Sequence, residues 1–493
     1  MPPPVIWIDV EDVLVHLNRG ARPTGIQRLS FEAARALVEV AGSARIRFLR
    51  HVPGGAGFYE VPYATLAAAY AAAVSAPAAH AVSIGGSARG GANSDPSAQA
   101  PSGLRRVWQG VGNRMPGEVR AALLDVLLPL WAAVRAVPRL VGAARRAQWR
   151  APRQAGGGRT LAEAGMAAGD VLFGLAAPWN SQHMARATAA RARHGLRYAT
   201  LVYDLIPVVR PEFSVVALGR RYREWALAMM PVCDVPMAIS QATRRDMEAF
   251  AAREGFALRA PVRVVPVGTG FPSIPADPGG AAAAAVPGEP YVLCVSTIEV
   301  RKNHLLLLRV WRRLVEEMPA GAVPKLVIAG GIGWLVDDFM QQMRNAGFLG
   351  GRIEVVDSPS DAALAALYRG AMFSVYPSHY EGWGLPVVES HDFGTPVVCA
   401  DGSSLPEAGG ALARYFEADS VGDATRVIRG LIEDPVGLAA WRAEVRAGFR
   451  PVPWRETAVA MIEAIDAACA GEGVNVEKVE IRPEKMDGAG RAV

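Results

Sequence analysis

The feature that most constrains the fold is a regular alternation of short apolar runs and helical patterns in the second half of the chain. Apolar runs typical of buried strands are expected at 291–296, 325–329, 353–356, 373–376 and 396–400. Alternation of this kind predicts a parallel, doubly wound α/β sheet. Such sheets bind ligands beyond the carboxyl ends of their strands, so the residues after each run are the first candidates for a functional site.

The first half of the chain shows the same alternation less regularly. Strands are expected at 5–8, 45–50, 171–175, 197–205, 235–239 and 262–267. A polar turn is expected after residue 8, followed by a helix from about Thr24 to Val40, and Ser240 is expected to cap a helix that begins at Gln241. At 493 residues the chain is long enough for two α/β domains, each with its own core.

Changes in composition along the chain indicate the domain boundaries. Residues 272–290 are rich in Pro, Ala and Gly, and they are predicted to link an N-terminal, acceptor-side domain at 1–271 to a C-terminal domain at 291–455. A further helical pattern covers 456–470. The tail at 471–493 is charged and polar, and it is predicted to be disordered.

The region at 83–159 is interpreted as a basic and partly flexible insertion. Its first part, 83–99, is rich in Gly, Ser, Ala and Asn, which is typical of a flexible loop. Eleven arginines stand against two acids between 103 and 159. Two interpretations stay open: a patch that binds an anionic membrane surface, with Trp131 and Trp149 at the headgroup level, or helices that pack on the N-terminal domain.

Cysteine usage and the N-terminus favour a reducing, cytoplasmic compartment. The four cysteines have no metal-ligand spacing: Cys233, Cys294, Cys399 and Cys469. Residues 1–10 carry no signal-peptide pattern, and the alanine-rich stretch at 64–82 is interpreted as a buried or surface helix. The chain is expected on the inner face of the membrane if the insertion binds lipid. The formal net charge is only +5, and its excess lies in the insertion, which argues against a nucleic-acid partner.

The most informative stretch begins at the end of the expected strand 373–376. A loop with Glu381, Gly382 and Gly384 follows that strand, and a helix is expected after it. Flexible glycines before a helix N-terminus let backbone N–H groups approach an anion. This stretch therefore predicts a phosphate-binding loop.

A second carboxylate, Glu389, is expected in the first turn of the helix after this loop. Glu381 and Glu389 would then both lie at the mouth of the sheet, where one accepts hydrogen bonds from ribose hydroxyls and the other from sugar hydroxyls. The alternative for Glu389 alone is an acid that merely favours the helix dipole.

Two adjacent cations, Arg301 and Lys302, follow the first strand of the second half. A cation pair at the carboxyl end of a strand can hold a diphosphate and neutralise it as it departs. The alternative is a solvated helix start, which an isolated Arg-Lys pair would favour. The chain has very few lysines, and one of them lies here, which favours the diphosphate.

The two motifs together resemble the retaining GT-B glycosyltransferases of family 4 (glycosyl transferases group 1), and in particular bacterial polysaccharide and O-antigen mannosyltransferases. Thr-x-Glu-x-Arg-Lys-Asn stands at 297–303 and Glu-Gly-x-Gly-Leu-Pro-x-x-Glu at 381–389, with supporting matches at 24–28 and 203–207. The resemblance covers most of the chain. It implies two facing Rossmann-like domains with a cleft between them, a nucleotide sugar bound by the second domain, and a helix at 456–470 that crosses back onto the first.

The resemblance assigns roles to the matching residues. Glu381 would contact the donor sugar near the reacting carbon, Glu389 the ribose hydroxyls, and Arg301 and Lys302 the diphosphate. Further donor contacts are implied for Gly25, Gly382, Gly384, Leu385, Val356 and Asp357, and contacts on the acceptor or sugar side for Tyr203 and Asp204.

The implied reaction transfers a hexose, with mannose favoured, from a nucleotide sugar such as GDP-mannose to a glycan or lipid-linked acceptor in cell-surface polysaccharide synthesis. The anomeric configuration is retained, the departing diphosphate takes the acceptor proton, and the protein mainly positions groups and stabilises charge. No cofactor is implied. The sequence has no Asp-x-Asp, so transfer is expected to need no metal.

Departures from the family pattern leave other functions open. Tyr203 stands where the family has His, and a phenol does not protonate near neutral pH. A catalytically silent relative that only binds a nucleotide or a partner is therefore an alternative, disfavoured because both carboxylates and both cations are intact. A pyridoxal-dependent phosphorylase of similar fold is disfavoured because no lysine stands in a fitting context.

Overall fold

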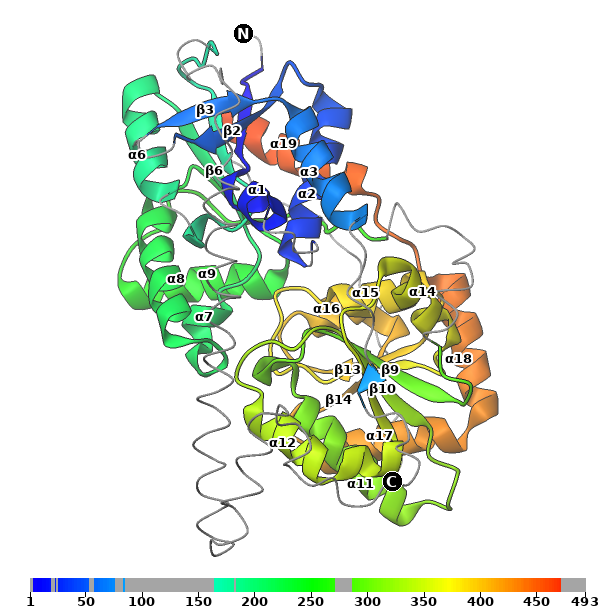
Figure 1. Cartoon of the computed structure of the whole chain (residues 1–493). Coiled ribbons are helices and arrows are strands. Elements are labelled where there is room, and N and C mark those ends of the chain that lie inside the picture. The colour runs from blue at the N-terminus through cyan, green and yellow to red at the C-terminus, as the bar shows by residue number, and fades with distance from the viewer. Residues whose placement is uncertain are drawn as a thin grey trace, which may run out of the picture. The chain divides into compact units, whose positions relative to one another are not determined.

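The computed structural model of the chain describes residues 3–18, 23, 25–52, 57–75, 83–84, 164–180, 183–270 and 286–470. These residues form two seven-stranded sheets. Helices flank both sheets (Figure 1). The fold class predicted from the sequence, two doubly wound α/β domains of the GT-B type, is confirmed.

The first sheet has the strand order β3-β2-β1-β5-β6-β7-β8, and its strands pair in parallel except for β2 with β3. The buried apolar run Ile6-Trp7-Ile8 places β1 at the centre, as expected for a parallel strand covered on both faces. The strands are β1 Ile6–Asp9, β2 Ile46–His51, β3 Phe58–Val61, β5 Val171–Gly174, β6 Arg197–Val202, β7 Val235–Ala238 and β8 Arg263–Val264.

Helices cover this sheet, and the last helix of the described chain is one of them. Helix α19 (Trp454–Ala470) buries Met461 and Ile465 in the first core and packs against α2 (Figure 1). Ser240 caps α9 as predicted, since its Oγ accepts a hydrogen bond from the Thr243 backbone N–H at 2.9 Å. The other helices are α1 Glu11–Asn18, α2 Ile26–Ala41, α3 Tyr63–Ser75, α6 His183–His194, α7 Ile206–Val209, α8 Val216–Met229 and α9 Gln241–Glu254.

The second sheet has the order β14-β13-β12-β9-β10-β11-β4. Every strand predicted for this half is confirmed to within one residue at either end. The strands are β4 Ser83–Ile84, β9 Tyr291–Val295, β10 Lys325–Ala329, β11 Ile353–Val356, β12 Ser374–Tyr376, β13 Val397–Ala400 and β14 Arg414–Phe416. The helices are α11 His304–Glu317, α12 Asp337–Asn345, α13 Gly347–Gly351, α14 Asp361–Gly370, α15 Leu385–Asp392, α16 Leu405–Gly409, α17 Val421–Glu433 and α18 Pro435–Gly448.

Two local predictions were wrong. The polar turn expected after β1 contains α1, because Val13, Leu14 and Leu17 form one buried face despite the acidic start of this segment. Ser83–Ile84, expected to begin a flexible loop, form β4 instead and pair antiparallel with Val355–Val356. The unpaired backbone groups of an edge strand such as β11 readily accept a further strand.

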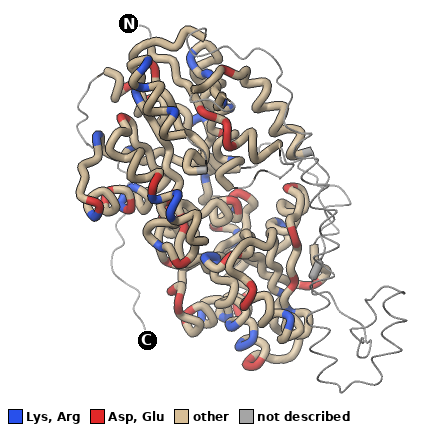
Figure 2. The backbone as a smooth tube through the Cα atoms, turned by 60° about the vertical axis from the view of Figure 1, so that its left-hand side comes forward, with Lys and Arg blue, Asp and Glu red and all other residues tan. Residues whose placement is uncertain are grey.

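Several predictions fall outside the described residues. They concern most of the basic insertion, with Trp131 and Trp149, the linker up to residue 285, and the tail from residue 471. The alanine-rich helix is confirmed at Tyr63–Ser75, and residues 76–82 are not described. Figure 2 shows positive and negative residues interspersed along the described backbone.

Candidate active site

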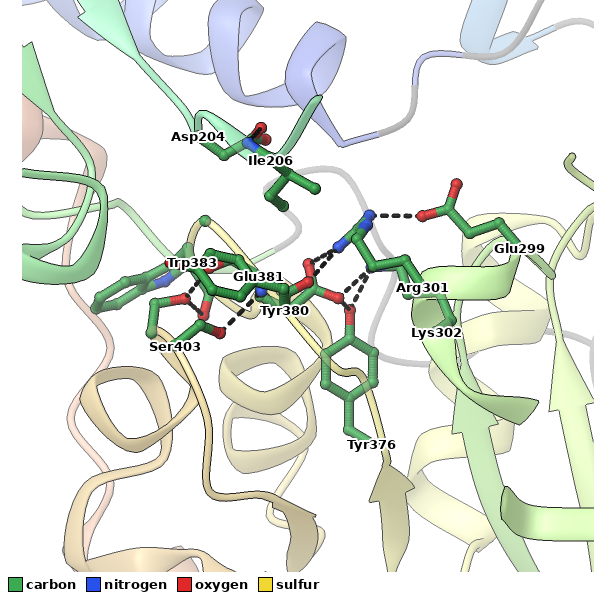
Figure 3. Close-up of polar contacts among 12 residues, drawn as sticks. Asp204, Ile206, Glu299, Arg301, Lys302, Tyr376, Tyr380, Glu381, Trp383 and Ser403 are labelled. Carbon is green, nitrogen blue, oxygen red and sulfur yellow. Dashed lines mark hydrogen bonds and ion pairs between the residues drawn. The ribbon is translucent and has the colours of Figure 1, made fainter. Parts of the chain in front are cut away.

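The loop after β12 carries Glu381 and is fixed by the loop after β13. Ser403 Oγ accepts a hydrogen bond from the Glu381 backbone N–H at 2.8 Å. Ser404 Oγ donates to the backbone oxygens of Glu381 and Trp383, at 2.9 and 2.7 Å. The backbone is therefore held on both sides of Glu381, whose side chain points toward Arg301 and Lys302 (Figure 3).

Arg301 and Lys302 lie in a short 3-10 turn, Val300–Lys302, directly after β9. Arg301 Nη1 and Lys302 Nζ each lie 2.6 Å from a different carboxylate oxygen of Glu381. The structure thus brings together Glu381, Arg301 and Lys302, the three candidate catalytic residues to which the sequence analysis assigned the donor sugar and the diphosphate. We call these residues, with Tyr376, the Glu381 cluster.

Neighbouring groups complete this cluster. Tyr376 Oη accepts a hydrogen bond from Lys302 Nζ at 2.7 Å and donates one to Glu381 Oε1 at 2.9 Å. Arg301 also pairs with Glu299, at 2.6 Å, and donates to the backbone oxygen of Tyr380 at 2.7 Å. Two cations and two carboxylates therefore share one largely buried site.

This arrangement fixes the charge of each group. Burial opposes ionisation of Glu381, but Arg301 and Lys302 outweigh it and hold the pKa of this carboxyl at about 2. Burial and the neighbouring Arg301 lower the pKa of Lys302, while Glu381 counteracts them. The side chains of Glu381, Arg301 and Lys302 stay 9%, 16% and 12% exposed, so a ligand can reach them.

The turn that presents the cations is locked to the neighbouring strand. Asn303 has the left-handed conformation, with φ of 56°, and its Nδ2 donates to the backbone oxygens of Pro377 and Ala418 at 3.2 and 2.9 Å. Asparagine tolerates this conformation better than most residues. The loops that follow β9 and β12 are therefore tied together by one amide side chain.

Gly382 lies against the backbone that follows β6 of the first sheet. A Cβ atom at position 382 would lie 2.1 Å from the Tyr203 carbonyl oxygen, which only glycine avoids. Thr243 Oγ1 lies 3.2 Å from that oxygen and 3.4 Å from the Gly382 carbonyl oxygen, and it accepts a hydrogen bond from Ser240. The Glu381 loop thus touches the first domain through backbone.

Glu389 lies in α15 but not where the sequence analysis expected it. The helix begins at Leu385 after the N-cap Gly384, so Glu389 falls in the second turn, and the prediction of a first-turn acid was wrong. Its Oε2 accepts a hydrogen bond from Tyr368 at 3.2 Å, and its Oε1 lies 3.5 Å from Arg28 Nη1. A first-turn dipole effect therefore does not account for Glu389.

Arg28 comes from α2 of the first domain and contacts two carboxylates of the second. It pairs with Asp361 at 2.9 Å and with Glu389. Burial raises the pKa of Glu389 to about 7, although Arg28 and Tyr368 act against this rise. We call Glu389, Arg28, Asp361 and Tyr368 the Glu389 cluster.

The remaining predicted donor contacts occupy the loop ends of both sheets. Gly25 is the N-cap of α2, with φ of 44°. Val356 ends β11, and Asp357 follows it and accepts a hydrogen bond from Ser358 Oγ at 2.8 Å. Gly384 needs its freedom from a side chain, because a Cβ would lie 3.0 Å from Leu405 at a φ of 129°. The contacts of these four residues with a nucleotide-sugar donor remain predictions.

Tyr203 and Asp204, predicted on the acceptor or sugar side, differ in placement. Tyr203 is 3% exposed, and its hydroxyl hydrogen-bonds with Ser30 Oγ at 2.9 Å and with the Leu175 backbone oxygen. Its side chain thus lies in the first core. Asp204 lies near the Glu381 cluster (Figure 3), and burial raises its pKa while Arg301 opposes the rise.

Several residues of the site were not singled out from the sequence. Arg28 lies in the matched segment 24–28, but its carboxylate partners, Glu389 and Asp361, are more than 300 residues away in the sequence. Tyr376 ends the strand before the Glu381 motif and Ser403 lies in the loop after β13, and nothing in their residue type marked them. Their roles depend on tertiary contacts.

The two sheets define a two-domain GT-B protein, and its second domain holds a carboxylate between two cations at adjoining strand ends. Residues 281–447 match the family model of glycosyl transferases group 1, and this domain belongs to that family.

The chain is also similar to individual known proteins. The chain is 26% identical over 272 residues to the serotype-specific mannosyltransferase WbdA of Escherichia coli, covering 52% of this chain and 32% of that protein. It is 36% identical over 170 residues to the O-antigen chain mannosyltransferase B of Escherichia coli, covering 34% and 39%. Among solved structures, the sucrose-phosphate synthase of Thermosynechococcus elongatus aligns with a TM-score of 0.46 at 21% identity, covering 61% and 74%.

The chain spans 32% and 39% of the length of these two mannosyltransferases. Within the described residues, every helix is too short or too polar to cross a membrane.

Proposed function

We propose that the chain is a retaining hexosyltransferase that uses a nucleotide sugar, with GDP-mannose as the favoured donor, and a glycan or lipid-linked acceptor. The observation that carries this proposal is the Glu381 cluster, in which Glu381 pairs with both Arg301 and Lys302 at 2.6 Å. The named mannosyltransferases among the relatives support mannose over other hexoses.

Arg301 and Lys302 are proposed to bind the diphosphate and to stabilise its growing charge as the sugar leaves. An ammonium group has three donors, and the contacts with Tyr376 and Glu381 use two of those on Lys302. Its third proton is available for a phosphate oxygen. Charge stabilisation of this kind accelerates the reaction because it is stronger in the transition state than with the intact donor.

Glu381 is proposed to bind the donor sugar as a permanent anion rather than to transfer a proton. A carboxyl with a pKa of about 2 is a poor base near neutral pH. The acceptor proton is proposed to pass to the departing diphosphate, so the new bond forms on the face from which the diphosphate leaves. Retention of the anomeric configuration follows from this geometry.

Glu389 is proposed to bind the ribose hydroxyls. Its buried carboxylate already accepts a hydrogen bond from Tyr368, and a ribose hydroxyl would offer a further donor. Because Arg28 contacts the same carboxylate from the first domain, ribose binding would couple the two domains.

A thermal-shift panel tests the donor proposal. GDP, UDP, ADP and their hexose conjugates are added to the full chain, since a ligand at 100 times its Kd stabilises the folded state by about 2.7 kcal/mol. GDP and GDP-mannose should raise Tm most, and the Glu389→Ala variant should lose most of that rise. If no nucleotide raises Tm, the proposal is wrong.

Product analysis tests the reaction. Incubation with GDP-mannose and a mannose-terminated lipid-linked or aryl acceptor should give an α-linked product, the configuration of the donor, by NMR. An inverted product would contradict the proposed geometry. The same rate is expected with and without EDTA added immediately before the assay. A loss that millimolar manganese or magnesium restores would show that a metal bridges the diphosphate.

The position of the enzyme is proposed to be the cytoplasmic side of the membrane, with anionic lipid as a partner of the basic insertion. Each arginine near an anionic surface contributes about 1 kcal/mol, and salt screens this attraction. Sedimentation with anionic vesicles should therefore decrease with salt and on removal of residues 103–159. Equal sedimentation with neutral vesicles, or none, would contradict the membrane interpretation.

A further inference from the structure

We propose that Asp9, His51 and His183 bind one divalent transition-metal ion of the zinc class within the first domain. Asp9 ends β1, His51 ends β2 and His183 begins α6, so three separate elements meet at this point. One donor atom from each residue lies within 4.8 Å of the other two. All three residues are buried, with exposures of 5%, 9% and 0%.

The three side chains already converge on one oxygen atom. Asp9 Oδ2 lies 2.7 Å from His51 Nε2 and 2.6 Å from His183 Nδ1. Ligands that coordinate a zinc ion at about 2.1 Å lie about 3.4 Å apart in a tetrahedral site, which is less than 1 Å wider than these two distances. Binding an ion therefore requires only a small outward shift of side chains that are already aligned.

The surrounding contacts are those that orient metal ligands. His183 Nε2, the nitrogen that faces away from Asp9, lies 3.0 Å from Tyr198 Oη. Asp9 Oδ1 accepts a hydrogen bond from the Glu11 backbone N–H at 3.0 Å, which leaves Oδ2 for coordination. A metal-bound histidine almost always uses its second nitrogen in a hydrogen bond that fixes the ring.

The packing around the site preserves this arrangement. A Cβ atom at Gly174 would lie 2.8 Å from Tyr198 Oη and 3.4 Å from His183 Nε2, so a side chain there would displace the phenol that orients the histidine. The Phe58 ring meets both imidazoles edge-on, at centroid distances of 5.4 and 6.2 Å. These apolar and aromatic neighbours hold the ligands in a site that water reaches poorly.

Two imidazoles and one carboxylate suit zinc and its neighbours in the first transition series better than magnesium or calcium, which prefer oxygen ligands. Three protein ligands leave one tetrahedral position for water. The proposed ion would join the carboxyl ends of β1 and β2 to α6. The ion would lie in the first domain, separate from Arg301 and Lys302 in the second.

The alternative is that Asp9 simply accepts hydrogen bonds from the two imidazoles. Hydrogen bonds alone require no ion, whereas the proposal predicts stoichiometric binding with these residues as ligands. The test uses the full chain, freed of metal by dialysis and then titrated with CoCl2. We expect one Co²⁺ per chain, with the intense visible absorption of a tetrahedral centre, displaced by ZnCl2 and accompanied by a rise in Tm.

His51→Gln is the main variant, because His51 lies at a strand end and is the most exposed of the three ligands. It should bind Co²⁺ at least tenfold more weakly and lose the tetrahedral spectrum. Tyr198→Phe keeps the ring but removes the hydroxyl, and its affinity should fall about 10- to 100-fold.

His379→Gln is the matched control, since His379 pairs with a carboxylate, Asp419, at 3.2 Å outside this group. It should bind Co²⁺ as the wild type does. Circular dichroism checks that each variant is folded. The proposal is overturned if the wild type binds no Co²⁺, if its spectrum is that of hexa-aqua cobalt, or if folded His51→Gln and Tyr198→Phe both bind like the wild type.

Discussion

The Glu381 cluster and the Glu389 cluster each hold a buried glutamate, yet their surroundings give the two carboxyls opposite behaviour. Two cations of the same domain lie against Glu381, and they hold its pKa at about 2. Glu389 has one arginine at 3.5 Å, from the other domain, and burial raises its pKa to about 7. The number and origin of the cations therefore decide whether a buried carboxyl keeps a fixed charge or can change it near neutral pH.

The largest expected effect is that of Glu381→Ala. Removing this carboxylate leaves Arg301 and Lys302 buried with less compensation, and breaking a buried ion pair costs about 3–5 kcal/mol. Urea denaturation should show a loss of that order, and transfer should fall sharply while the surviving folded protein still binds free nucleotide. Glu433→Gln, which disturbs an exposed pair with Arg429, is the control and should cost less than about 1 kcal/mol.

Arg301→Ala and Lys302→Ala should lower the rate more than the binding. If each cation stabilises charge that develops in the transition state, kcat should fall by about 10²–10³, as for the loss of one preorganised donor. The Kd of the free nucleoside diphosphate, measured by calorimetry, should change less than kcat. Equal losses in both would mean that the cations only bind the ground state.

Glu389→Ala should have the opposite profile. Loss of a charged hydrogen bond to ribose should weaken nucleotide binding by about 1–3 kcal/mol, with a smaller effect on kcat. Asp392→Ala is the control, because Asp392 is an exposed acid on the same helix. Should the Asp392 variant lose as much affinity as the Glu389 variant, the effect would come from helix charge and not from a contact.

The pH dependence separates the two clusters further. The folded-state pKa of Glu389 is raised from its ordinary value of 4.5 to about 7, so its contribution to stability is fully present below 4.5 and is lost as pH rises through about 7. As the pH rises through about 7, Glu389, the proposed acceptor of the ribose hydroxyls, becomes charged, so nucleotide affinity should rise with pH. Calorimetry on Glu389→Gln should give a flat profile, whereas a profile like that of the wild type would assign the titration elsewhere.

The smallest expected effect is a shift in the pH dependence of nucleotide affinity. Arg28 favours the charged form of Glu389, so Arg28→Ala should move the midpoint of nucleotide affinity to higher pH. Arg28→Lys, which keeps the charge, should restore part of the shift. An unchanged midpoint in Arg28→Ala would show that Arg28 does not stabilise the charged form of Glu389.

The sequence predicted the second domain better than the first for a physical reason. The five strands predicted for it are buried apolar runs, whereas β8 of the first domain is a two-residue strand that is only half-buried. The Glu381 and Arg301–Lys302 motifs are short segments directly after such buried runs. Helix α1 was missed because acidic residues begin it and its buried face is only three residues wide. Short strands such as β3 and β14 carry too few residues for a period to show.

Contacts between distant segments could not be predicted from one sequence. In the sequence, nothing distinguishes Arg28 from an ordinary helical arginine. In the fold, α14 and α15 place Asp361 and Glu389 beside it. Asp9, His51 and His183 are separated by 42 and 132 positions, and no spacing rule for metal ligands covers such distances. The packing of strands and helices against one another, and not a local sequence pattern, brings these residues together.

The hydroxyl of Thr243 has a single proton but two carbonyl oxygens within reach, those of Tyr203 and Gly382. One of these oxygens belongs to the first domain and the other to the loop of Glu381. Rotation of the Thr243 hydroxyl can therefore move its hydrogen bond from one oxygen to the other. Sliding of one backbone past the other would exchange one hydrogen bond for a nearly equivalent one. Thr243 would thus let the two backbones shift past each other at little cost in hydrogen bonding. A methyl group at position 382 would clash with the Tyr203 carbonyl oxygen and push the two backbones apart.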